Sequence, residues 1–226
     1  MKSLLIVVAL LTFATSLPAN ATVIGGAVTG GTAFTAGGTF VKLTVPLANP
    51  VGAPNSVGND TFQTPNLYAF DEDQNILLAA PLSVDVGASP IAAGTKVASH
   101  YVFFDPGPTQ SMIGTVNFDS NVLGIITSDG LLAASDFLAN TGVNYLNPTL
   151  RGLEAGDAVT ISGLQQIMFN VTASTPGDYV RVLTAFSPGA TPLPGALPLF
   201  ASGLGVMGLL GWRRKRKKNV TALAAA

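Results

Sequence analysis

The chain contains no cysteine among its 226 residues. This absence excludes a disulfide framework, a cysteine nucleophile, and zinc or iron–sulfur sites built on thiolates. A domain without disulfides is held together by its hydrophobic core. The segment 22–186 is long enough to bury about two-thirds of its unfolded surface, so it needs no disulfides.

Histidine is almost as scarce, because His100 is the only one. Serine and aspartate are plentiful, so a serine–histidine–acid arrangement fits the composition. However, the sequence has no G-x-S-x-G motif and no helix with paired histidines. We interpret His100 as a strand residue with a hydrogen-bond partner, and we predict no catalytic residue and no cofactor. An exported hydrolase that uses His100 is the alternative.

Charged residues make up only 10% of the chain, and they are unevenly distributed. All 12 acidic residues lie in the segment 22–186. The same segment holds four basic residues, namely Lys42, Lys96, Arg151 and Arg181. Its net charge of −8 repels nucleic acid and anionic lipid, so we expect no nucleic-acid partner.

Short segments of alternating apolar and polar residues predict β-strands. The alternating apolar positions are Val41, Leu43 and Val45, then Leu82, Val84 and Val86, then Ile167, Phe169, Val171 and Ala173, and finally Val180 and Val182. The continuous apolar runs 101–104 and 122–127 predict strands buried on both faces. Turn-forming sequences separate these segments, and the pattern predicts an all-β fold, an antiparallel β-sandwich over residues 22–186.

Two segments fall outside this alternation. Residues 130–139 follow a possible cap at Ser128-Asp129 and predict one short helix over an end of the sandwich. Residues 22–38 are rich in Gly, Thr and Ala, and they predict a loose lead-in with an edge strand.

An acidic segment, Asp71-Glu72-Asp73-Gln74-Asn75, has the alternating side chains that begin a calcium loop. However, Ile76 occupies the position of the required glycine, and Leu82 that of the bidentate glutamate. We interpret the segment as a polar hairpin connection and predict no metal site. A weak calcium site at Asp71 and Asp73 is the alternative.

The N-terminus has the features of a signal peptide over residues 1–21. Lys2 precedes the apolar run Leu4–Ala14, and Pro18 follows it. Ala19-Asn20-Ala21 then supplies the small residues that signal peptidase requires, which places the cut between Ala21 and Thr22. An uncleaved anchor is the alternative, but the apolar run is short for a membrane span.

The C-terminus combines a linker, an apolar segment and a basic cluster. Residues 187–194 are a Pro- and Gly-rich linker that ends in Pro192-Leu193-Pro194. Residues 195–212 carry no charge, and they predict one transmembrane helix. The predicted helix is thin, because its glycines carry no side chains. One face carries three small residues where another helix could pack, namely Ala201, Gly205 and Gly208.

Residues 213–226 form a basic tail. Six consecutive bases begin it, namely Arg213, Arg214, Lys215, Arg216, Lys217 and Lys218. Because positive charge is retained on the cytoplasmic side, the cluster acts as a stop signal and fixes an N-outside, C-inside topology.

Motif, apolar helix and basic cluster together resemble the PEP-CTERM sorting domain, in its Val-Pro-Leu-Pro-Ala-like subtype. The resemblance covers residues 191–218. Leu193 stands in place of the family's glutamate, Thr191 in place of valine, and Gly195 in place of alanine. The resemblance implies export, a membrane-held intermediate, and processing by exosortase, a membrane cysteine transpeptidase. It also implies a Gram-negative host that makes exopolysaccharide.

From these features we expect a non-enzymatic exported protein of the cell surface or extracellular matrix. Its expected partners are signal peptidase, exosortase, the inner membrane before processing, and exopolysaccharide. The alternative is an adhesive sandwich that binds carbohydrate or calcium, which requires clustered loop acids or an exposed aromatic strip. The aromatic residues available for such a strip are Tyr68, Tyr101, Tyr145 and Tyr179.

Overall fold

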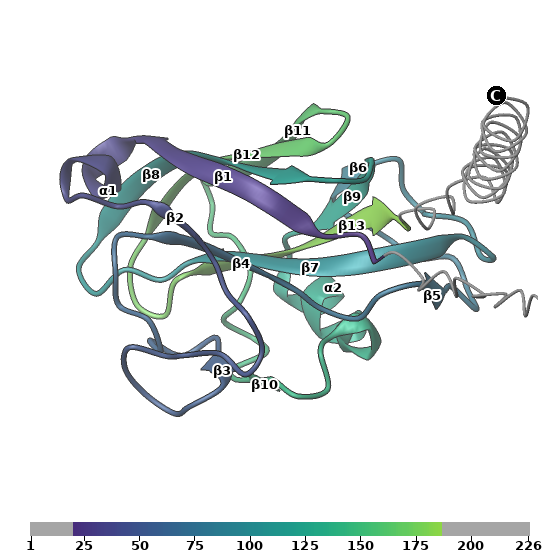
Figure 1. Cartoon of the computed structure of the whole chain (residues 1–226), viewed down its shortest axis with the longest axis horizontal. Helices are drawn as coiled ribbons and strands as arrows, with labels where there is room; N and C mark the ends of the chain where they lie inside the picture. The colour runs from purple at the N-terminus through teal and green to yellow at the C-terminus, as the bar shows by residue number, and fades with distance from the viewer. Residues whose placement is uncertain (1–19, 187–226) are drawn as a thin grey trace, which may run out of the picture. The chain divides into compact units, whose positions relative to one another are not determined.

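Residues 20–186, the part of the chain that the computed structural model describes, are mostly β-strand with few helices (Figure 1). The strands are β1 (Val23–Gly30), β2 (Phe40–Lys42), β3 (Ser56–Val57), β4 (Leu67–Asp71), β5 (Ile76–Leu77), β6 (Val86–Gly87), β7 (Lys96–Phe104), β8 (Gln110–Phe118), β9 (Val122–Ile126), β10 (Asn144–Tyr145), β11 (Ala158–Gly163), β12 (Gln166–Ala173) and β13 (Asp178–Ala185). The helices are α1 (Gly31–Thr35), α2 (Asp129–Ala134) and the 3-10 turn η1 (Asp136–Leu138).

The strands form two main sheets and one small one. The four-stranded sheet has the order β1-β8-β12-β11. The seven-stranded sheet has the order β2-β4-β7-β13-β9-β6, and β5 also pairs with β7. Strands β10 and β3 form a two-stranded sheet. The pairings are antiparallel except β2 with β4 and β10 with β3, which are parallel.

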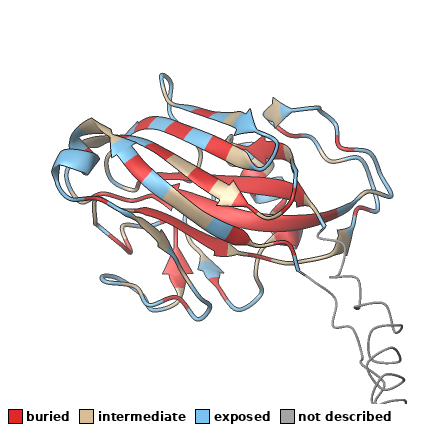
Figure 2. Cartoon of the chain, turned by 45° about the horizontal axis from the view of Figure 1, so that its top comes forward, coloured by how far each residue is buried: buried red, intermediate tan, exposed pale blue. Residues whose placement is uncertain are grey.

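The two main sheets pack face to face, as expected of an all-β sandwich. Along β12 the side chains alternate strictly, with Phe169 buried and Met168 and Asn170 exposed. Inward-facing residues of β12 and β8 join residues of the larger sheet, such as Val102 and Val180, in one hydrophobic core. Figure 2 shows this alternation along the smaller sheet, with continuous burial in the strands behind it.

A third layer covers the other face of the seven-stranded sheet. Here Phe103 and Tyr179 pack with Leu132 of α2 and Leu138 of η1 in a second hydrophobic core. The larger sheet is therefore buried on both faces. The apolar run 101–104 lies in β7 and is buried throughout, as predicted. The run 122–127 extends one residue beyond β9, and only its residues 124–126 are fully buried.

The helix predicted near 130–139 is present, but it is divided into α2 and η1. Both pack on a face of the larger sheet and not over an end of the sandwich. Ser128 is the N-cap residue, yet its hydroxyl donates to Asp85 and not to the helix. The prediction of a single helix is wrong, because α1 adds a further turn after β1.

The strand predicted from Leu82, Val84 and Val86 is largely absent. Only Val86 belongs to a strand, and Leu82 forms an isolated bridge with Ile91. The cause is Asp85, whose carboxylate accepts hydrogen bonds from the backbone N–H groups of Thr127 and Ser128. These bonds hold the segment as a loop.

No helix within residues 20–186 is long and apolar enough to cross a membrane. The segments predicted as most of the signal peptide (1–19), the linker and motif (187–194), the transmembrane helix (195–212) and the basic tail (213–226) lie outside the described residues.

Candidate functional site

The smaller sheet carries no charged residue, although the domain as a whole is acidic. Strands β1, β8, β11 and β12 contain no Asp, Glu, Lys or Arg. Small polar and amide side chains alternate with a few aliphatic ones on its outer face. These side chains include Ile113, Thr115, Asn117, Thr160, Gln166, Met168, Asn170 and Thr172. The outer face is therefore a neutral surface.

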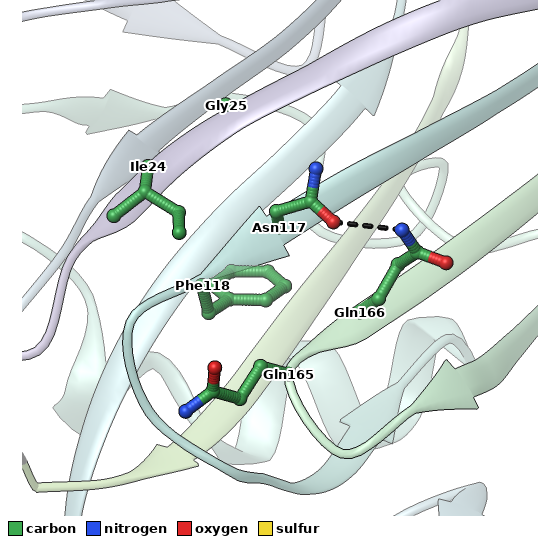
Figure 3. Close-up of a pocket in the computed structure, with 6 residues that line it drawn as sticks. All are labelled: Ile24, Gly25, Asn117, Phe118, Gln165 and Gln166. Atoms are coloured by element: carbon green, nitrogen blue, oxygen red, sulfur yellow. Dashed lines mark hydrogen bonds between the residues drawn. The ribbon is translucent and has the colours of Figure 1, made fainter.

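A shallow pocket of about 280 Å³ lies at one end of this neutral face (Figure 3). Its lining comes from β1, from the end of β8, from the start of β12 and from the turn before it. The lining residues are Ile24, Gly25, Asn117, Phe118, Gln165 and Gln166.

Hydrogen bonds hold the pocket amides in place. The Gln166 side-chain amide donates to the Asn117 Oδ1 at 2.7 Å, because β12 and β8 place these residues side by side. The Gln165 amide donates to the Asp119 carbonyl at 3.2 Å. Within residues 20–186, the Asn117 Nδ2 and the Gln165 Oε1 have no protein partner. The pocket therefore offers an uncharged donor and acceptor beside the apolar Ile24.

Apart from the pocket, the domain contains a fully buried polar group, the pair Arg181 and Glu72. The Arg181 guanidinium donates through Nε and Nη2 to both oxygens of Glu72, at 2.8 and 2.9 Å, and neither side chain is exposed. Burial alone would lower the pKa of Arg181, but the charge and hydrogen bonds of Glu72 raise it above its ordinary value. This pair is a buried bidentate ion pair.

The ion pair joins the larger sheet to the third layer. Arg181 Nη1 donates to the Leu132 carbonyl of α2 at 3.0 Å and to the hydroxyl of Ser135, between α2 and η1, at 2.6 Å. Glu72 accepts further hydrogen bonds from Ser99 and Tyr145, each at 2.6 Å. Arg181 Nη2 also lies 3.2 Å from the Asp136 Oδ1, and this carboxylate is partly exposed, whereas Glu72 and Arg181 themselves are sealed from solvent.

His100 lies in β7, inside the sandwich. Its Nδ1 is 2.8 Å from the Asp71 Oδ1, and its Nε2 is 3.0 Å from the Thr184 hydroxyl. The order acid–histidine–hydroxyl is that of a catalytic triad, but His100 and Thr184 are both 0% exposed. The prediction of a strand histidine with a hydrogen-bond partner is confirmed.

Three carboxyls have a raised pKa, which often marks an active site, and two of them, Asp105 and Asp178, are buried. Burial raises the pKa of Asp105 to about 6. Burial, with the charges of Asp157 and Glu154, raises the pKa of Asp178 to about 7. Asp105 and Asp178 are at most 2% exposed, and neither lines the pocket in Figure 3, so we assign them no chemistry.

The acidic segment around Asp71 is not a hairpin connection, so that prediction is wrong. Strands β4 and β5 do not pair with each other, as in a hairpin, but both pair with β7. Between them, the backbone of Glu72 and Asp73 stays hydrogen-bonded to Ser99 of β7, while the Glu72 side chain turns inward to Arg181. The Asp71 carboxylate accepts from the Thr22 hydroxyl, the Val23 N–H, Lys42 and His100.

Burial opposes ionisation of Asp71, but His100, Lys42 and Thr22 together lower its pKa below the ordinary value. The carboxylate is therefore ionised and fully engaged. Within residues 20–186 there is no group of three or more acidic or histidine side chains arranged to hold a metal ion. Asp73 therefore belongs to no such group of metal ligands within these residues.

The four tyrosines do not form the exposed aromatic strip for which they were candidates in the adhesive alternative. Tyr68, Tyr101 and Tyr179 are at most 4% exposed, and Tyr145 packs edge-on against Tyr101 at 5.2 Å between ring centres. They lie in the second core because their strand faces are covered by the third layer.

Of the residues predicted to direct processing, Ala21 and Thr22 belong to the folded domain, and Ala21 is 1% exposed. The rest lie outside the described residues, namely Ala19, Pro192, Leu193, Pro194, Ala201, Gly205, Gly208 and Arg213 to Lys218.

Sequence reasoning missed the neutral face and the Glu72–Arg181 pair. The four uncharged segments are visible in the sequence, but only the sheet order shows that they are neighbours. Comparison with known proteins finds no matching family model, no matching curated protein and no matching solved structure.

Proposed function

We propose that the chain is an exported, non-catalytic protein of the cell surface or extracellular matrix, sorted through a PEP-CTERM-like tail that exosortase processes. The observation that carries this proposal is the coincidence of Pro192-Leu193-Pro194, an uncharged apolar run and six bases within residues 191–218. The fold supports it, because the last strand, β13, ends at Ala185, directly before the linker. The domain can therefore be exported as one unit ahead of the tail.

The interior of the domain supports a non-catalytic role. The histidine and the hydroxyl that could form a triad, His100 and Thr184, are sealed in the core, and the Glu72–Arg181 pair is equally inaccessible. Signal peptidase and exosortase are then the processing partners, and an N-outside, C-inside inner-membrane form is the intermediate.

Neutralising the basic cluster tests the sorting proposal. Replacing the six residues Arg213 to Lys218 with Ser and Gln removes the charge that resists translocation. We expect the protein to pass through the inner membrane and collect unprocessed in the periplasm or medium. Fractionation and immunoblotting of a host with an exosortase measure this. Retention of the variant in the membrane at wild-type level would contradict the stop-signal role. The matched control replaces each arginine of the cluster with lysine and each lysine with arginine, which keeps the positive charge.

A second candidate function is binding of a neutral carbohydrate, and the uncharged sheet face favours it. Sugar hydroxyl groups both donate and accept hydrogen bonds, as side-chain amides do. The pocket supplies a donor on Asn117 and an acceptor on Gln165 that have no partner within residues 20–186, with Ile24 as an apolar contact. A charged ligand finds no counter-charge among the lining residues.

Glycan-array binding of the exported protein tests this candidate. We expect neutral glycans to bind and chelation of calcium to have no effect, because no carboxylate lines the pocket. Asn117→Ala with Gln165→Ala removes both unpaired groups, and we expect affinity to fall at least about tenfold. Thr160→Ala, on the same face but outside the pocket lining, is the control. Equal binding by both variants would contradict a site at the pocket.

A further inference from the structure

Thr22, the residue after the predicted signal-peptidase cut, is held at both ends of its backbone. Its N–H donates to the Asp119 Oδ1 at 2.8 Å, and its carbonyl accepts from the Asp119 N–H at 3.1 Å. Asp119 lies in the turn between β8 and β9. The nitrogen that would become the mature N-terminus therefore already contacts a carboxylate.

The Thr22 side chain is fixed as well. Its hydroxyl donates to the Asp71 Oδ2 at 2.6 Å, and Lys42 Nζ donates to the same hydroxyl and to the Val23 carbonyl. The charged and titratable groups around the Thr22 nitrogen are thus Asp119 after β8, Asp71 on β4, Lys42 on β2 and His100 behind Asp71. Lys42 and His100 already engage Asp71, so Asp119 is the carboxylate available to a positive group at the Thr22 nitrogen.

We propose that this corner is a binding site for the mature N-terminus, in which Asp119 forms an ion pair with the α-ammonium group of Thr22. The inference rests on the proposed export. Hydrolysis of the Ala21–Thr22 bond adds hydroxide to the Ala21 carbonyl carbon and a proton to the Thr22 nitrogen. The new amine then takes a second proton from water, so the donor to the Asp119 carboxylate changes from a neutral N–H to a charged ammonium group.

The same geometry sets the order of events. Ala21 is 1% exposed, and the Thr22 nitrogen is bound to Asp119, so a peptidase cannot reach the bond between them once the domain has folded. The cut therefore precedes folding of the exported chain.

The pH dependence follows from the ion pair. A free α-amino group has a pKa of about 8, and a neighbouring carboxylate raises it. The folded form then binds the proton more tightly than the unfolded form. As long as Asp119 is ionised, the stabilisation is accordingly complete below about pH 8 and is lost as the pH rises through the folded-state pKa of the amine.

The test uses the full gene, expressed and exported in a Gram-negative host, with the processed protein purified. N-terminal sequencing identifies the first residue. Reductive methylation with ¹³C-formaldehyde followed by NMR then gives the pKa of the α-amine. Asp119→Asn keeps the side-chain oxygen that accepts the hydrogen bond but removes its charge. Asp157→Asn is the matched control, since Asp157 also accepts one backbone N–H, that of Thr172.

We expect Thr22 as the first residue, and an α-amine pKa that is raised in the wild type and in Asp157→Asn but returns toward about 8 in Asp119→Asn. An equal pKa in wild type and Asp119→Asn overturns the ion pair, and a mature chain that begins at Asn20 overturns the cut on which it depends. A chain that still begins at Met1 instead shows that the export proposal has failed. Purified signal peptidase should cleave the unfolded precursor at least about tenfold faster than the folded one, and equal rates overturn the proposed order.

Discussion

Replacing Arg181 with methionine is expected to lower the free energy of unfolding by about 3–5 kcal/mol. The substitution keeps an unbranched apolar stem but removes the guanidinium group, and with it the charge that Glu72 needs. Glu72 would then be a fully buried carboxylate without its counter-charge, and the Leu132 carbonyl would lose its donor. The loss is large because removing one partner of a buried pair leaves the other uncompensated.

Chemical denaturation at pH 7, followed by circular dichroism, measures this loss. Lys96→Met is the matched control, because Lys96 is an exposed base on the same sheet, and we expect a change within about 0.5 kcal/mol. Adding Glu72→Gln to Arg181→Met removes the unpaired charge and should restore part of the stability. A loss below about 1 kcal/mol for Arg181→Met would contradict the structural role of the pair.

The strands and helices predicted from the sequence are correct where the local pattern of apolar residues agrees with the burial in the structure. Strand β12 is the clearest case, because Ile167, Phe169 and Val171 face the core and the residues between them face solvent. The helix near 130–139 was also predictable, since its apolar positions lie on short-range repeats. The sandwich as a fold class follows from many such segments.

The third layer is what the sequence pattern did not reveal about the burial of Arg181 and the tyrosines. Alternation around Val180 and Val182 places Arg181 on the opposite face of β13, which a two-layer sandwich would leave in solvent. In the structure, α2, η1 and the loop segments cover that face, so Arg181 and Tyr101 are fully buried. Local periodicity does not report which long-range segment covers a face. The ion pair of Arg181 with Glu72, far apart in sequence, could not be predicted for the same reason.

The candidate pocket could not be predicted from the sequence for a related reason. Its lining joins Ile24 near the start of the domain to Asn117 and Gln166, which become neighbours only through the order β1-β8-β12. The sequence does show that these segments are uncharged. It does not show that they form one surface.

The second prediction with a large effect concerns the tail. Changing both Pro192 and Pro194 to alanine should abolish processing by exosortase and leave membrane insertion intact. Insertion depends on the apolar run 195–212 and the bases that follow, and neither is altered. Processing depends on recognition of the motif itself. Pro198→Ala is the matched control, because it removes a proline just outside the motif and should be processed normally.

The most direct test of the proposed function is the mass of the protein recovered from a host that contains an exosortase, for the wild type and for the Pro192→Ala, Pro194→Ala variant. The proposal predicts that the wild type is shortened at its C-terminus and reaches the cell surface. The variant should remain in the inner membrane with its tail intact. A variant processed and localised like the wild type would show that the tail is an ordinary membrane anchor, and it would contradict sorting through a PEP-CTERM-like motif.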